Sequence, residues 1–173
     1  FMAASAEALA ARLYEPTDPF FAGLCRKTAE DDWKHAMEGM RRRKNANSSE
    51  SGEQLLDTAA AGVVTSVELF RTTGEPHYGE SAARLAETVI SFQQQEYFKE
   101  LDIKLAGFFW DSPSREYMLH KHHLSQMHAP ILGLTMLCES LPNHSDWMRW
   151  YSSIVLYAEY LKAIAGYTQP YGM

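Results

Sequence analysis

One helical pattern near the middle of the chain constrains the fold more than any other feature. Between residues 55 and 70, apolar side chains recur at intervals of three and four residues, which places them on one face of an α-helix. Most of the other positions are small and few are charged, so the pattern predicts a helix that is buried nearly all round. It ends at Thr72-Thr73-Gly74, where glycine suits the left-handed residue that often terminates a helix.

Five further segments carry helical spacing, and together they predict an all-α fold. They cover residues 3–13, 25–43, 76–95, 130–141 and 145–161, the last with Ser145 as its cap. The connections after the third and fifth helices are short, so the helices they join should be antiparallel neighbours. No segment shows the alternation of a β-strand. We therefore expect one helical domain over residues 1–173, built from antiparallel helical hairpins in series.

The same periodicity predicts which side chains form the core. The eight apolar side chains expected to be buried are Val63, Val67, Phe70, Leu85, Val89, Leu134, Leu137 and Ile154. The third and fifth helices are rich in small and aliphatic residues, whereas the fourth and sixth also carry a polar face. This alternation favours a layer of buried inner helices covered by amphipathic outer ones.

Composition excludes some classes of partner. The formal net charge is −6 at pH 7, which argues against a protein that binds a nucleic-acid backbone through clustered positive charge. No stretch approaches the roughly 18 apolar residues needed for a membrane span, and the sequence given carries no signal peptide. The two cysteines, Cys25 and Cys138, lie within apolar patterns and are expected to be buried free thiols.

An aromatic and histidine-rich segment breaks the helical pattern between about residues 97 and 127. Aromatic rings stack on the apolar faces of sugars, while imidazole and amide groups form hydrogen bonds with hydroxyls. The side chains expected to bind a glycan are Trp110, Tyr117, His120, His122, His123 and Gln126, together with Tyr171 on the loop after the last helix. Asp111 is the carboxylate of this segment best placed for acid or base catalysis. An aromatic-stabilised surface loop is the alternative interpretation.

A metal site and other cofactor sites are not predicted. Four histidines lie within nine positions, but no two have the four-residue spacing of a helical zinc pair. No aspartate or glutamate occurs between Tyr117 and Leu137 that could complete such a site. The sequence also contains no phosphate-binding glycine loop, dinucleotide fingerprint or nucleophile elbow.

Several stretches resemble the six-hairpin glycosidases, and more narrowly bacterial proteins related to family nine glycoside hydrolases. The similar stretches are residues 58–94 with the turn Gly74-Glu75-Pro76-His77-Tyr78, His120-Lys121-His122-His123, and residues 132–139, 146–151, 160–162 and 167–173 with Pro170-Tyr171-Gly172. The resemblance implies an (α/α)6 toroid of twelve helices in two layers, which cleaves glycosidic bonds in oligo- or polysaccharides with paired carboxylates. This chain would supply about half of such a barrel. The aspartate-glycine-aspartate motif of authentic family nine enzymes is absent.

The sequence therefore leaves three hypotheses. A glycoside hydrolase of the six-hairpin type would act outside the cytoplasm, in the periplasm or the extracellular space. A non-catalytic helical domain would instead bind a glycan or a partner protein, and a plain structural bundle would do neither. Because part of a barrel leaves an apolar edge uncovered, self-association through that edge is also expected.

Overall fold

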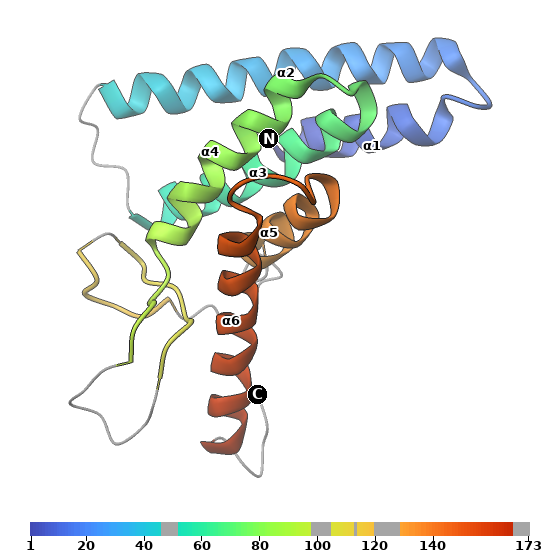
Figure 1. Cartoon of the computed structure of the whole chain (residues 1–173). Coiled ribbons are helices and arrows are strands. Elements are labelled where there is room, and N and C mark those ends of the chain that lie inside the picture. Colours follow the sequence, from blue (N-terminus) through green and yellow to red (C-terminus); the bar gives the residue numbers. More distant parts are fainter. Residues whose placement is uncertain (46–51, 98–104, 113, 120–128, 168–173) are drawn as a thin grey trace.

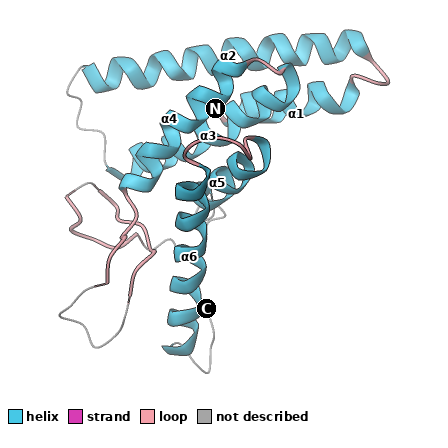
Figure 2. Ribbon diagram, viewed as in Figure 1, coloured by secondary structure: helices cyan, strands magenta, loops and turns pink. Residues whose placement is uncertain are grey.

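The computed structural model of the chain describes residues 1–45, 52–97, 105–112, 114–119 and 129–167 (Figure 1). The six helices in this part of the chain are α1 (Met2–Tyr14), α2 (Pro19–Asn45), α3 (Gly52–Thr73), α4 (Pro76–Ser91), α5 (Ala129–Ser140) and α6 (Trp147–Tyr167). No β-strand occurs among the described residues, as Figure 2 shows. The predicted all-α class is confirmed. The residue before α6 is Asp146, so the predicted cap at Ser145 lies one position too early.

The turn between α3 and α4 forms as its residue types predict. Gly74 has φ +73°, and its N–H donates a hydrogen bond of 2.8 Å to the Phe70 carbonyl. A left-handed glycine in this position satisfies one of the last free carbonyls of α3. Glu75 is extended, and Pro76 then opens α4, where its missing N–H costs no hydrogen bond.

Helix α3 is the centre of the molecule. It packs against α1, α2, α4 and α5, and the sequence of contacts runs from α1 through α3 to α5. In Figure 1, α1, α3 and α5 run in one direction, while α2 and α4 run in the opposite direction. The pairs α1–α2 and α3–α4 are thus antiparallel, and the first helices of the successive pairs lie side by side.

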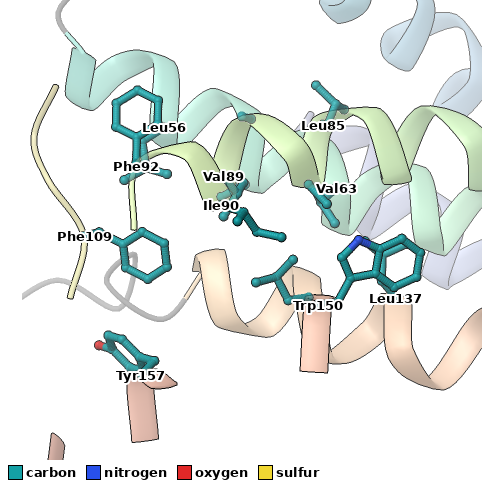
Figure 3. Close-up of a cluster of buried hydrophobic side chains, with 14 of the residues drawn as sticks. Leu56, Val63, Leu85, Val89, Ile90, Phe92, Phe109, Leu137, Trp150 and Tyr157 are labelled. Atoms are coloured by element: carbon teal, nitrogen blue, oxygen red, sulfur yellow. The ribbon is translucent and has the colours of Figure 1, made fainter. Parts of the chain in front are cut away.

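Close packing joins the central helices. A Cβ atom added at Gly133 of α5 would lie 2.9 Å from Cγ1 of Val63 on α3, so the absence of a side chain lets these helices approach. Figure 3 shows Val63, Val89 of α4 and Leu137 of α5 in the same cluster. Burial of one such side chain stabilises the folded protein by roughly 1.5–3 kcal/mol.

Six of the eight predicted core side chains are buried, and the other two are partly buried. The buried ones are Val63, Val67, Leu85, Val89, Leu134 and Leu137. Phe70 and Ile154 keep some exposure, because Phe70 lies one turn from the end of α3 and Ile154 lies at the margin of the core. The periodicity therefore identified the buried face correctly.

Polar side chains fix the first helix pair on α3. The Thr72 hydroxyl donates to the Ala8 carbonyl of α1 at 3.0 Å. From α2, the indole N–H of Trp33 donates to the Ser66 hydroxyl at 2.8 Å, and both residues are buried. These contacts join residues more than 30 positions apart, so they specify how α1 and α2 lie on α3.

Helix α6 takes a direction that the short connection did not predict. Figure 1 shows α6 running steeply across the line of the other helices rather than back along α5. Near the connection, the Trp147 indole N–H donates to the Cys138 carbonyl at 3.0 Å. Farther along, α6 also packs against the irregular segment after α4, where the Gln93 amide donates to the Ser153 carbonyl of α6. The expectation of a second simple antiparallel hairpin is corrected by this packing.

Large apolar side chains are exposed at several places among the described residues. Leu13, Tyr14 and Phe20 lie around the connection from α1 to α2, and Met148 and Val155 lie on α6. Self-association through such surfaces stays a prediction. None of the helices, over their described residues, combines the length and the apolar character that a bilayer span requires.

A charged network joins three helices at one end of the central layer. Glu68 of α3 is 7% exposed, and its carboxylate oxygens lie 2.8 Å from the Arg12 guanidinium of α1 and 3.5 Å from that of Arg71. Arg71 also pairs with Glu139 of α5 at 2.9 Å and donates to the Ser140 hydroxyl at 2.7 Å. Removing the central carboxylate would take away the ion-pair partner of Arg12 and one of the partners of Arg71, which would keep Glu139 and Ser140.

We expect Glu68→Ala to lower the free energy of unfolding by about 2–3 kcal/mol, measured by urea denaturation. The value is below the roughly 3–5 kcal/mol of a fully buried pair, because both arginines keep some contact with water. Glu139→Ala is the matched control, since its side chain is 64% exposed and its loss should cost less than about 1 kcal/mol. Equal losses in the two variants would contradict the central role of Glu68.

Candidate functional site

The chain after α4 folds back on itself as a compact irregular segment. The Gln94 N–H donates to the Phe108 carbonyl at 2.9 Å, and the Gly107 N–H donates to the Gln94 carbonyl at 2.8 Å. The Trp110 N–H then donates to the Phe92 carbonyl at 2.8 Å. Isolated bridges therefore hold the segment together without forming a regular strand.

The side chain of Gln93 is the polar centre of this region. It is fully buried, and its amide donates to the carbonyls of Gly107 and Ser153, each at 2.9 Å. Its carbonyl oxygen accepts hydrogen bonds from the Ser153 hydroxyl and from the Gln95 amide. Since every polar atom of this buried amide is satisfied, Gln93 fixes the segment against α6.

Gly107 allows the closest approach between the segment and α6. Its φ is +99°, and a Cβ atom at this position would lie 2.1 Å from the Leu156 carbonyl oxygen. No side chain fits at that distance. Aromatic rings surround the contact: Phe108 packs near Tyr160, and Phe109 lies opposite Tyr157 (Figure 3).

The structure places two of the predicted site residues in different environments. Trp110 is only 9% exposed, packs edge-on against Phe108 and donates its indole N–H to the Gln94 side chain at 3.1 Å. A ring so deeply buried offers little face for a sugar, so the predicted stacking role of Trp110 is corrected. Tyr117 is 69% exposed and remains available to a ligand.

Asp111 has a structural task in the same loop. Its N–H donates to the Tyr117 carbonyl at 3.0 Å, and its carboxylate accepts the Tyr117 N–H at 3.3 Å. This exchange closes the loop between the two residues. Catalysis by Asp111 stays a prediction.

The remaining predicted site residues lie outside the described residues. They are His120, His122, His123, Gln126 and Tyr171. Among the residues that the structure does describe, no group of three or more histidine, cysteine, aspartate or glutamate side chains could hold a metal ion.

A cavity of about 780 Å³ opens between α1, α2, α3 and the start of α5. Its apolar wall includes Leu9 of α1, Val64 of α3 and Leu132 of α5. Met2 and Ala129 also line it, so α1 and α5 both present their first residue to the cavity. A volume of this size is within the range of small-ligand sites in proteins.

Polar groups come to the cavity mainly from α2 and the first two turns of α3. His35 and Arg43 lie two turns apart on α2, and Asp57 and Thr58 lie on α3. The cavity thus combines an apolar wall with hydrogen-bond donors and one carboxylate. Such a lining suits a ligand that has both an apolar face and polar substituents.

Sequence analysis missed this cavity, because its residues come from four helices that no single motif connects. A weak signal was present in the small residues of the facing helices. Ala36 and Gly39 of α2 and Ala61 of α3 all line the cavity. Small side chains on neighbouring helices leave space between them, but the sequence does not show which helices will face each other.

A carboxylate between α1 and α2 has an altered acidity. Burial raises the pKa of Glu7 above its usual value of 4.5, and the nearby negative charge of Asp32 raises it further. One oxygen of the Glu7 carboxylate is buried without a hydrogen-bond partner. Ionisation of Glu7 is therefore less favourable in the folded protein than in the unfolded chain.

Comparison with known proteins adds no relative: no family model, curated protein or solved structure matches this chain.

We expect Gly107→Ala to lower the free energy of unfolding by about 2–5 kcal/mol, combining positive-φ strain with overpacking against α6. Urea denaturation followed by near-ultraviolet circular dichroism would report both the loss and the loosened aromatic cluster. Gly166→Ala is the control, because nothing lies within 4 Å of its added Cβ and a helical alanine is favoured by about 0.5–1 kcal/mol. A Gly107→Ala protein as stable as the parent would contradict the close approach.

We expect Glu7→Gln to raise the melting temperature at neutral pH. The folded protein binds the Glu7 proton more tightly than the unfolded chain does, so stability from Glu7 is lost as pH rises from 4.5 through the raised pKa. The neutral amide should remove this loss, and the advantage should shrink on acidification below pH 4.5. Calorimetry at both pH values tests this, with the exposed Glu15→Gln as a control expected to show no such pH-dependent difference.

Proposed function

We propose that this chain is part of a six-hairpin carbohydrate-active protein and that it binds an oligo- or polysaccharide. The observation that carries the proposal is the order of helix packing. The first helices of successive pairs contact one another in turn, α1 with α3 and α3 with α5, while α2 packs chiefly on α1 and α4 chiefly on α3. A toroid of hairpins is assembled by repeating this arrangement.

The site proposed for the glycan is the cavity at the start of α1 and α5. Its apolar wall would meet the C–H faces of the sugar rings, and His35, Arg43 and Thr58 would form hydrogen bonds with hydroxyls. In the sequence, the histidine-rich segment with His122 and His123 ends just before Ala129, which itself lines the cavity.

Binding is better supported than hydrolysis. Glycoside hydrolysis uses two carboxyl groups, about 5 Å apart in retaining enzymes and about 6.5–9.5 Å apart in inverting ones. Asp57 is the only carboxylate among the described residues that line the cavity. Hydrolytic activity, and action in the periplasm or outside the cell, are proposed for the whole six-hairpin glycosidase of which this chain would be a part.

The test is a titration of the whole chain with soluble oligosaccharides of neutral and acidic sugars, followed by calorimetry and by amide chemical shifts. Ala6→Trp should weaken binding at least about tenfold, or about 1.4 kcal/mol, because the indole enters the cavity from an exposed position of α1. His123→Ala should weaken binding by about 1–3 kcal/mol through lost hydrogen bonds.

The matched control is Ala3→Trp, which adds the same ring at an exposed position of α1 that does not line the cavity. It should bind like the parent. If no oligosaccharide binds, the proposed function is wrong. If the two tryptophan variants weaken binding equally, the cavity is the wrong site.

A further inference from the structure

A second, smaller cavity lies between the segment after α4 and the C-terminal half of α6. Its volume is about 320 Å³. The lining residues are Tyr97, Ala106, Leu156, Glu159, Lys162 and Ala163. None of these residues belongs to the larger cavity or to the site residues predicted from the sequence.

The two walls of this cavity are held at a fixed separation. Below it, the Gln93 amide joins the segment to the Ser153 carbonyl of α6, and both side chains are buried. Gly107 then brings the backbone of the segment against the Leu156 carbonyl. Because Leu156 and the neighbouring Ala106 both line the cavity, the tightest contact of the region forms its floor. The cavity is therefore preorganised by the fold.

The backbone that leads to Tyr97 is anchored in the same way. The Gln94 amide donates to the Glu96 carbonyl at 2.6 Å, and the carbonyl oxygen of the same side chain accepts the buried Trp110 indole N–H. Gln94 is itself buried. Directly after these anchored residues, the Tyr97 side chain is 54% exposed at the cavity.

The rim of the cavity carries one donor group and one acceptor group. The Lys162 ammonium lies 2.9 Å and 3.2 Å from the two carboxylate oxygens of Glu159. Their charges cancel, so the rim does not select a charged ligand. An ammonium group has three donor positions and a carboxylate has about four acceptor positions, so both can also bind hydroxyl groups.

We propose that this cavity is a second glycan subsite, which takes one neutral hexopyranose unit. The proposal rests on the proposed function and extends it to a separate site. The C–H face of the sugar ring would stack on Tyr97 above the floor of Ala106, and neighbouring hydroxyls would bind Lys162 and Glu159. The volume lies at the lower end of the range for ligand sites, which fits one sugar ring rather than a chain.

The experiment is a titration of the whole chain with methyl β-D-glucopyranoside, followed by amide chemical shifts. Saturable shifts are expected for residues 156–163 of α6. Tyr97→Ala should reduce the affinity at least fivefold, whereas Tyr97→Phe should retain it, because the aromatic face remains. Lys162→Met should weaken binding and leave the stacking contact in place. Circular dichroism would show that these exposed substitutions leave the fold unchanged.

Tyr151→Ala is the matched control, since the Tyr151 side chain is also exposed but lies on α6 and does not line this cavity. It should bind the sugar like the parent. Absence of saturable shifts in residues 156–163 would overturn the subsite, as would binding that survives Tyr97→Ala unchanged. An oligosaccharide that still binds the chain and is blocked by Ala6→Trp would then show that only the subsite has failed. If no sugar binds either cavity, both proposals fail.

Discussion

Burial of α3 on four sides is the constraint on which the rest of the structure depends. A helix in this position must offer a side chain or a gap to each neighbour, and α3 uses small, aliphatic and polar residues for different neighbours. Val63 packs against the glycine face of α5, whereas Ser66 and Thr72 bind α2 and α1. The apolar contacts supply most of the stabilisation, and the polar ones select a single arrangement.

Charged side chains around Glu68 also help to select the arrangement of the helices. Two arginines lie within ion-pair distance of one carboxylate, and one of them also binds α5. Ion pairs of this kind add less stability than their number suggests, because each charge loses hydration. Their value here is geometric, because α1, α3 and α5 are joined by one network of charged side chains. Where those three helices begin, the space between them remains open as the larger cavity.

The sequence predicted the parts of the structure that local periodicity determines. The buried face of α3 and the turn at Gly74 follow from residue spacing and backbone preference, so both were predictable. The direction of α6 was not, because it is set by contacts such as that of Gln93 with Ser153, which are 60 residues apart. Trp110 shows the same limit. An aromatic side chain suits a sugar site or a core equally well until its hydrogen-bond partner is known.

The two cavities differ in the interactions that hold their walls in place. The larger one is bounded by four helices, and small side chains such as Gly39 and Ala61 leave the space between them. The smaller one has buried hydrogen bonds directly beneath it, which fix its floor and leave Tyr97 as its exposed ring. A weak ligand such as one sugar ring gains most from such a rigid site, because little ordering of the protein opposes binding. Rigidity beneath Tyr97, more than aromatic content alone, therefore favours sugar recognition there over recognition at the buried Trp110.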